Sequence, residues 1–286
     1  QVNKFAESLS EEESQAFLKW MLQDHFTFLG YDELQVDGKA EKLKISRVAG
    51  SEMGTLKRYA QPGREKVFNQ LRQAERQFVL TPTPVMFAKD SFRSQVHRPA
   101  YRDMVVVKRF DPQGQVVGEC RFYGLYTSTV FNELPARIPL IRRKLSHIVE
   151  RAGFDTRGHS GKDLLQVLND LPREELFLSD SSELFETAMG IFNLQERRKV
   201  RLFIRRDPCG KFFSCLYYVP RDIYSTLLRQ QVESLLCQQL NAHDTEFNTL
   251  FSDSVLARTH LVLQVDPEAE LEVDVKAIEA QVIDAS

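Results

Sequence analysis

The sequence predicts an α+β fold made of two modules in tandem, and three observations support this prediction. The chain has 286 residues, enough for two domains. Two hairpins share the turn Asp-Pro-x-Gly, at residues 111–114 and 207–210, and each lies between runs rich in β-forming residues. In such a turn the Asp side chain accepts from the backbone, Pro fixes φ and Gly tolerates positive φ. Each second strand then leads on to an amphipathic helix, so the two halves repeat one pattern.

The first module is predicted to be an antiparallel sheet with short helices. An N-terminal helix is expected in residues 1–25, where Ser10 can cap a run with apolar residues on one side. Strands are expected at 25–31, 43–48, 78–80, 84–91, 103–110 and 115–127, and helices at 67–76, 135–152 and 159–171. A central antiparallel sheet with short helices on one side resembles a PAS-like module, which we assign to residues 26–172.

The second module, residues 173–267, is predicted to follow the order β-α-β-β-α-β with one added strand. Strands are expected at 175–178, 199–204, 212–219, 247–254 and 259–265, and helices from Ser181 or Ser182 to 192 and from Asp222 or Ser225 to 240. This order is the ferredoxin-like arrangement that ACT domains use, and it limits fold more than function. Residues 268–286 are expected to begin a further helix or a linker.

The strand at 115–127 alternates strictly, which places Glu119, Arg121 and Tyr123 on one face of the sheet and Tyr126 on the other. Glu119 and Arg121, two residues apart, are predicted to pair. As exposed neighbours they would add less than roughly 1 kcal/mol.

Composition and charge exclude several classes of protein. The chain is 42% hydrophobic with 20 Phe, which suits buried cores and argues against disorder. A formal net charge of -2 gives no support to nucleic-acid binding, and no apolar stretch is long enough to span a membrane. The four cysteines form no Cys-x-x-Cys pair and three lie in apolar runs. With no signal peptide, these features predict a cytoplasmic protein with free thiols.

No catalytic, cofactor or metal motif is evident. The glycines form neither a Gly-x-Gly-x-x-Gly nor a Walker loop, so no nicotinamide cofactor is expected on these residues. The six histidines are far apart in sequence, which disfavours a metal site. Nothing resembles a nucleophile elbow. We therefore predict no catalytic, cofactor-binding or metal-binding residue.

A ligand pocket in the first module is a weaker prediction, because core packing explains most of its aromatic residues. If a small molecule binds, the residues expected to line the site are His97, Arg121, Tyr123 and Tyr126. Two basic clusters, at 137–144 and 197–206, are expected to be solvated faces. The alternative is that they dock against an acidic surface of the same polypeptide or of a neighbouring subunit.

Five segments together resemble the amino-terminal region of the large bacterial NAD-dependent glutamate dehydrogenases. They are residues 94–99, 107–111, 118–128, 200–207 and 213–222, and the likeness runs from about residue 10 to 267. The resemblance implies a parent enzyme that oxidatively deaminates L-glutamate to 2-oxoglutarate and ammonia while reducing NAD. It also implies that this chain is part of a regulatory arm of PAS-like and ACT-like modules, since the catalytic motifs of the family do not occur here.

Two further expectations concern ligands and partners. The turn at 178–182 lacks the glycine that amino-acid-sensing ACT domains use, and Asp180 would repel a carboxylate, so we do not expect a free amino acid to bind there alone. The chain begins at Gln1 without Met, so we expect a piece of a longer polypeptide. Its expected partners are other domains of that polypeptide and, in the parent, further copies in a homo-oligomer. The alternatives are a freestanding small-molecule sensor, or an unrecognised enzyme using His97 and Arg121.

Overall fold

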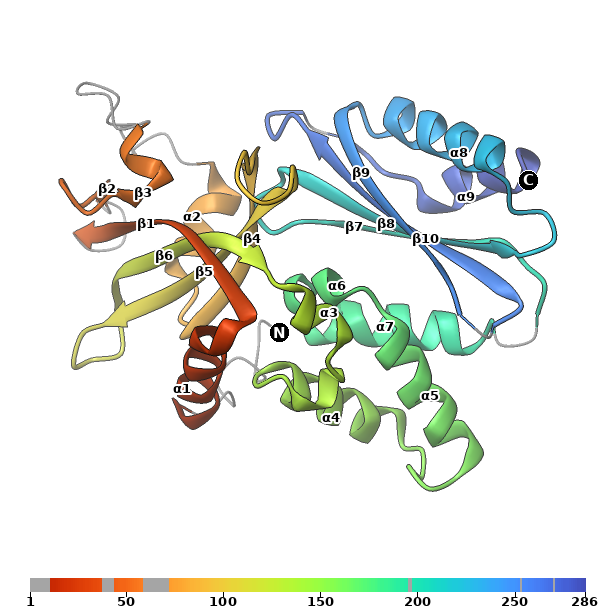
Figure 1. Ribbon diagram of the computed structural model, residues 1–286, viewed down its shortest axis with the longest axis horizontal. Coiled ribbons are helices and arrows are strands. Elements are labelled where there is room, and N and C mark those ends of the chain that lie inside the picture. The colour runs from red at the N-terminus through yellow and green to blue at the C-terminus, as the bar shows by residue number, and fades with distance from the viewer. Residues whose placement is uncertain (1–10, 38–43, 59–71, 195–196, 253, 270) are drawn as a thin grey trace. The chain divides into compact units, whose positions relative to one another are not determined.

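The computed structural model describes residues 11–37, 44–58, 72–194, 197–252, 254–269 and 271–286. It divides into two compact units, Gln1–Leu145 and Ser146–Ser286, and both mix helices with an antiparallel sheet (Figure 1). The mixed α+β class is therefore confirmed. The predicted module boundaries at 25, 172 and 267 stay predictions.

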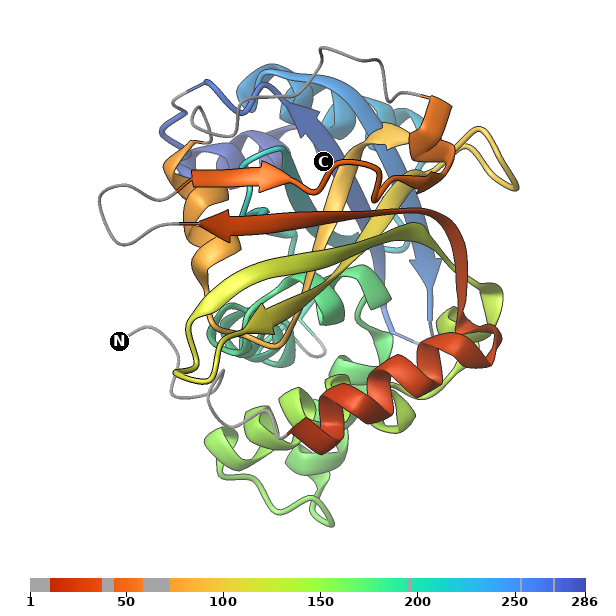
Figure 2. The ribbon, with the colours of Figure 1, turned by 90° about the vertical axis from the view of Figure 1, so that its left-hand side faces the viewer.

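Unit 1 contains a six-stranded antiparallel sheet with the order β2-β1-β6-β5-β4, in which β3 also pairs with β1. Figure 2 faces this sheet and shows the long strands β1 and β6 crossing it side by side. Its strands are β1 (Phe26–Asp37), β2 (Lys44–Arg47), β3 (Met53–Gly54), β4 (Val85–Arg93), β5 (Tyr101–Phe110) and β6 (Val116–Tyr126).

Helices cover both faces of the unit 1 sheet. On one face α1 (Glu11–Trp20) packs Phe17 edge-on against Phe87, with ring centroids 5.2 Å apart. On the other, α2 (Gln73–Leu80) buries Val79 against Leu34 and Ile45. The strand register sets Phe87 and Leu34 on opposite sides of the sheet. The other helices are the π turn Met21–His25, the 3-10 turns Thr55–Arg58 and Pro135–Arg137, α3 (Ser128–Asn132) and α4 (Ile141–Ala152), which crosses the boundary between the units.

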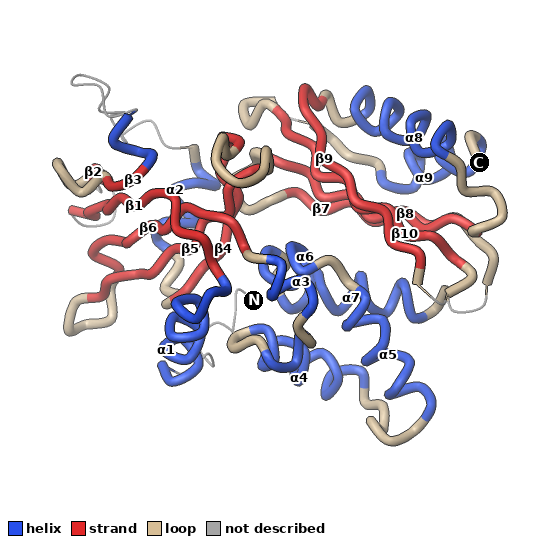
Figure 3. The backbone as a smooth tube through the Cα atoms, viewed as in Figure 1, coloured by secondary structure: helices blue, strands red, loops and turns tan. Residues whose placement is uncertain are grey.

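Unit 2 contains a four-stranded antiparallel sheet with the order β7-β8-β10-β9 and helices on both faces (Figure 3). The face that carries Leu202 and Tyr217 packs against α8 and α9. The face that carries Phe203 meets α7, whose Gly190 lies so close that a Cβ there would be 2.5 Å from the Phe203 ring. Its elements are α5 (His159–Asp170), α6 (Arg173–Leu178), α7 (Ser181–Phe192), β7 (Arg201–Arg206), β8 (Phe212–Pro220), α8 (Thr226–Gln239), β9 (Ala242–Phe251), β10 (Leu256–Val265) and α9 (Val275–Asp284).

Both Asp-Pro-x-Gly turns form as predicted. Asp111 accepts backbone N–H groups of Gln113 and Gln115 at 3.0 and 2.8 Å, and Gly114 takes a φ of +77°. Asp207 likewise accepts the N–H of Cys209 at 2.9 Å and of Phe212 at 2.6 Å. The two turns differ in burial, because Asp207 is only 7% exposed.

Two predicted strands are wrong, since both segments are helical. Residues 78–80 end α2, and residues 175–178 lie in α6. In α6, Pro172 precedes the helix and Glu174 and Glu175 lie in its first turn, where the helix dipole favours negative charge. The β-α-β-β-α-β order predicted for 173–267 is therefore wrong at its first element. The predicted helix at 67–76 lies mostly outside the described residues.

Candidate functional site

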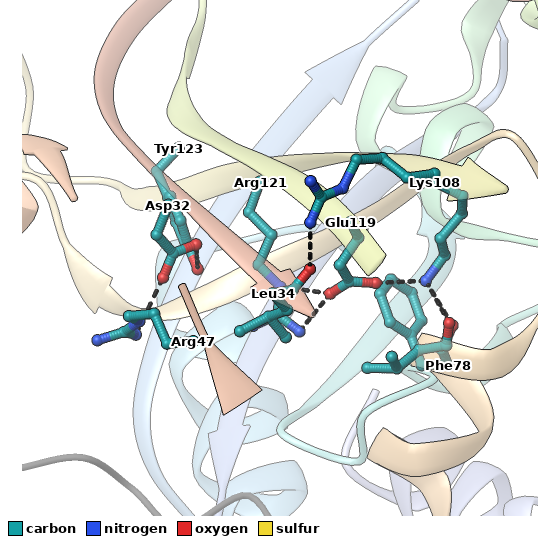
Figure 4. A network of polar contacts seen from close by, with 10 residues as sticks. Asp32, Leu34, Arg47, Phe78, Lys108, Glu119, Arg121 and Tyr123 are labelled. Atoms are coloured by element: carbon teal, nitrogen blue, oxygen red, sulfur yellow. Dashed lines mark hydrogen bonds and ion pairs between the residues drawn. The ribbon is translucent and has the colours of Figure 1, made fainter. Parts of the chain in front are cut away.

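Arg121 and Tyr123 lie side by side on the face of β6 that turns toward α2 (Figure 4). The register sets Arg121 opposite Asp32 on β1, and Tyr123 opposite Met104 on β5. Two of the four predicted pocket residues are therefore close together, on the face that the alternation of β6 predicts.

A buried network joins this face to α2, and we call it the Lys108 network: Lys108, Glu119 and Arg121. The Lys108 Nζ donates to Glu119 Oε2 at 2.5 Å and to the carbonyl oxygens of Phe78 and Val79, both at 2.9 Å. Those carbonyls belong to the last turn of α2, where the helix leaves acceptors unpaired. All three protons of the ammonium group thus have an acceptor, and its charge lies at the negative end of the helix dipole.

Glu119 also pairs with a second cation, Arg121, which lies on the same strand. The Arg121 Nε donates to Glu119 Oε1 at 2.5 Å, which confirms the predicted pairing. The prediction that these residues are exposed is wrong: the Glu119 side chain is 0% exposed and that of Arg121 only 14%, because α2 covers the face. Burial lowers the pKa of Arg121, but the Glu119 carboxylate outweighs this, and the net effect is a raised pKa. Arg121 therefore stays charged and is held inside the protein.

Asp32 extends the polar face toward β2. Its carboxylate forms an ion pair with Arg47 at 2.9 Å and accepts from the Tyr123 hydroxyl at 3.3 Å. Burial raises the pKa of Asp32, and the Arg121 and Arg47 charges offset this only in part. The Tyr123 hydroxyl is thus also engaged inside the protein.

The other two predicted pocket residues lie elsewhere in unit 1. Tyr126 is on the opposite face of β6, where its ring meets that of Phe26 at a centroid distance of 5.2 Å. His97 is exposed in the loop between β4 and β5, with a positive φ of 66°. The four residues thus do not form one cluster, and whether any of them binds a ligand stays a prediction.

Unit 2 has its own buried polar group, which we call the Glu175 cluster: Glu175, Arg205, Ser214 and His260. Arg205 on β7 donates to Glu175 on α6 through Nη2 at 2.7 Å. Beside this pair, the Ser214 hydroxyl and His260 Nε2 are 2.8 Å apart across β8 and β10. The cluster fastens α6 to the sheet.

Strong electrostatics hold the Glu175 carboxylate in its charged form. Burial raises the pKa of Glu175, but the Arg205 guanidinium and His260 outweigh it and hold the pKa at about 2. The Ser214–His260 contact resembles a nucleophile beside a base, yet both residues are under 9% exposed. A substrate has no direct access to a hydroxyl at that depth, so we assign the cluster a structural role. The sequence did not predict this cluster, because residues 175–178 were expected to form a strand, whereas Glu175 lies in α6.

Several residues of the two basic clusters are paired within their own unit. Arg142 binds Glu13 at 2.6 Å in unit 1, and Arg198 binds Asp222 at 3.1 Å in unit 2. Arg201 reaches Glu279 on α9 at 2.8 Å. Internal ion pairs therefore engage part of the charge of these clusters, and docking of the clusters against another surface stays a prediction.

Within the described part of the chain, no group of three or more His, Cys, Asp or Glu side chains is placed to hold a metal ion. Among the helices of that part, none combines the length and the apolar character that crossing a membrane requires. The four cysteines are free thiols, and Cys209 and Cys215 are buried.

Comparison with known proteins places both the helices and the sheet of unit 2 in one family. Residues 138–197 match the model of helical motif 1 of glutamate dehydrogenase. Residues 201–286 match the model of its ACT2 domain, so the sheet β7–β10 with α8 and α9 is an ACT-type domain.

Relatives match nearly the whole chain but only a small part of their own length. The NAD-specific glutamate dehydrogenase of Halomonas elongata is 45% identical over 93% of this chain and 17% of its own length. That of Pseudomonas aeruginosa is 44% identical over 98% of the chain, again 17% of its length. The Mycobacterium tuberculosis protein is 30% identical over 87% of the chain and 14% of its length. The chain thus belongs to the family of NAD-specific glutamate dehydrogenases, of which it matches one segment.

Proposed function

We propose that this chain is a non-catalytic regulatory and assembly region of an NAD-dependent glutamate dehydrogenase. The parent enzyme oxidatively deaminates L-glutamate to 2-oxoglutarate and ammonia and reduces NAD, which binds outside these residues. One observation carries the proposal: the chain aligns almost end to end with relatives of that name, yet spans only 17% of their length. The remaining 83% leaves ample room for a separate catalytic domain.

We further propose a role for unit 1, the partners of the chain and its location in the cell. We assign a PAS-like role to unit 1, in keeping with its antiparallel sheet between α1 and α2. Its partners are other domains of the same polypeptide and, through them, further copies in a homo-oligomer; nucleic acid and membrane are not partners. Free thiols are in keeping with a cytoplasmic location.

A freestanding sensor that uses unit 1 is the alternative. The polar groups that would recognise a ligand there are already engaged: Arg121 binds Glu119 and Tyr123 donates to Asp32. This arrangement favours the regulatory and assembly role over a sensor site at these two residues.

Two measurements test the proposal. The purified 286-residue chain, given L-glutamate and NAD, should form no NADH, whereas the full-length polypeptide should. Deleting this segment from the full-length polypeptide should change its oligomeric state in analytical ultracentrifugation, or its response to effectors. Turnover by the isolated segment would contradict the proposal, and so would a deletion variant with unchanged assembly and unchanged regulation.

A further inference from the structure

Leu140 has a backbone conformation that a leucine rarely adopts. Its φ is +65°, in the left-handed region where the Cβ atom of an L-residue crowds the backbone. The other non-glycine residues with positive φ in the described part of the chain are Asp24, His97 and Asn241. Asp, His and Asn are the residue types that enter this region more readily. Leu140 is therefore the strained member of this set.

The surroundings of Leu140 hold it in this conformation. Its side chain is only 4% exposed, so it is packed inside the protein. Its backbone N–H donates to Glu13 Oε2 on α1 at 3.0 Å. A strained backbone of this kind persists only where the structure around it leaves no easier alternative. Glu13 is thus a positioning residue for the backbone at Leu140.

The same carboxylate binds Arg142, and we call Glu13, Leu140 and Arg142 the Glu13 latch. Arg142 Nη2 donates to Glu13 Oε1 at 2.6 Å, and Arg142 Nε lies 3.1 and 3.2 Å from the two carboxylate oxygens. Burial raises the pKa of Glu13, but Arg142 and the Leu140 N–H outweigh it and lower the pKa, so the carboxylate is charged at neutral pH.

The latch is partly open to solvent, unlike the Lys108 network. The Arg142 side chain is 43% exposed, whereas Lys108 and Glu119 are fully buried. Water can therefore solvate the Glu13–Arg142 pair as it separates, and separating it costs far less than breaking a buried pair. The latch has the properties of a contact that can open and close.

The latch lies where one module ends and the next begins. The segment that matches helical motif 1 of glutamate dehydrogenase starts at residue 138. Ile138 is extended, with φ −80° and ψ 117°, and α4 begins at Ile141, directly after Leu140. α4 then continues past Leu145 into unit 2. The φ of Leu140 therefore sets the direction in which α4 leaves unit 1, and residues at the ends of elements are the usual hinges.

We propose that the Glu13 latch is a two-state joint between the sheet of unit 1 and α4. In the closed state Glu13 binds Leu140 and Arg142, and Leu140 is left-handed. In the open state these contacts are lost, Leu140 returns to negative φ, and α4 takes another direction. Strain favours opening and the Glu13 contacts oppose it, so an anionic group that binds Arg142 in place of Glu13 shifts the joint toward the open state. This inference goes beyond the proposed function, because it holds whatever reaction the parent enzyme catalyses.

NMR spectroscopy of the 286-residue chain tests the closed state directly, because the HN–Hα coupling and the carbon shifts of residue 140 report its φ. The wild type should show positive φ at Leu140. Glu13→Ala, which removes both acceptors, should return residue 140 to negative φ and raise the exchange rate of its amide about tenfold or more. Arg142→Met leaves the acceptor of the Leu140 amide in place and should give a smaller increase.

Residual dipolar couplings of the same samples measure the direction of α4 relative to the sheet of unit 1. Glu13→Ala should change this direction, whereas a contact that only adds stability would lower Tm and leave α4 where it is. Glu12→Ala is the matched control, because Glu12 is an exposed carboxylate in the same turn of α1, and it should behave like the wild type.

Four outcomes would overturn the proposal: negative φ at Leu140 in the wild type, positive φ retained in Glu13→Ala, an unchanged α4 direction in Glu13→Ala, or equal changes in Glu12→Ala. If Glu13→Ala does not fold, Glu13→Gln keeps the side-chain volume but loses the charge, and the same outcomes then decide. None of these measurements depends on glutamate turnover, so a failure here leaves the proposed function standing.

Discussion

The Lys108 network and the face around Arg258 on β10 both contain buried charged groups between a sheet and helices. They differ in how many of the buried donors have a hydrogen-bond partner. In unit 1 the Lys108 ammonium has three acceptors, and Glu119 is shared by two cations. In unit 2 Arg205 binds Glu175 through Nε and Nη2, but its buried Nη1 has no hydrogen-bond partner among the described residues, and neither have Nε and Nη1 of Arg258. A charged group whose donors are all paired should contribute more to stability than one whose buried donors lack a partner.

Removing Lys108 should have the largest effect on stability. Lys108→Met leaves the Phe78 and Val79 carbonyls and one Glu119 oxygen without their donor, so we expect a loss of about 3–5 kcal/mol in the free energy of unfolding. Urea denaturation followed by circular dichroism measures it. Lys276→Met, at an exposed position of α9, should change stability by less than about 0.5 kcal/mol. Equal stability of the two variants would show that the network is dispensable.

Glu175→Gln should have the second-largest effect on stability. The amide keeps an acceptor for Arg205 but removes the negative charge, and we expect a loss of about 2–3 kcal/mol. If the cluster fastens α6, native-state hydrogen exchange should rise in α6 more than in α8. A uniform rise across unit 2 would contradict the local role assigned to the cluster.

The contribution of Glu175 to stability should also depend on pH. This change should be smaller than the loss caused by Glu175→Gln at neutral pH, and its direction follows from the pKa. Its folded-state pKa of about 2 lies below its ordinary value of 4.5, so its stabilising contribution is present above pH 4.5 and is lost as the pH falls toward 2. The stability difference between wild type and Glu175→Gln should therefore shrink over that window in urea titrations. A constant difference would mean that the carboxylate is not held in its charged form.

For Asp32 in unit 1, the contribution to stability should change with pH in the opposite direction. Burial raises its pKa above the ordinary value of 3.8, so the folded protein takes up a proton before the unfolded chain does. Acidification toward pH 3.8 should then stabilise the wild type relative to Asp32→Asn. A relative loss of wild-type stability in the same urea experiments would show that the pairing with Arg47 outweighs burial.

Replacing Arg258 should have the smallest effect on stability. Because Nε and Nη1 of Arg258 are buried without a hydrogen-bond partner among the described residues, Arg258→Met should change the free energy of unfolding by less than about 1 kcal/mol, or raise it. A loss as large as that of Glu175→Gln would reveal a partner for Arg258 in solution and would remove the contrast between the two regions.

The sequence predicts local features of this fold better than its long-range ones. Turn chemistry identified both hairpins, and alternation along β6 identified the shared face of Glu119 and Arg121. The sequence did not predict that α2 buries Glu119 and Arg121, because charged residues at spacing two are more often exposed. Residues 78–80 read as a strand for a similar reason: the α2 carbonyls are satisfied by Lys108, about 30 residues away in sequence.

The candidate sites show the same limit. The pocket prediction joined residues close in sequence or aromatic in character, and the structure keeps only Arg121 and Tyr123 together. The Glu175 cluster draws on α6, β7, β8 and β10, and no spacing in the sequence marks it. Glu13 and Leu140 are 127 residues apart and meet only through the tertiary fold.

The matching hairpin turns bear on how the chain acquires its structure. Each turn is closed by an Asp side chain that binds backbone two to five residues ahead, so it needs no distant partner. Short-range contacts of this kind form early, because little chain entropy is lost in closing a short loop. We therefore expect each hairpin to form independently of the other, so that the first can begin to fold while the ribosome is still making the second.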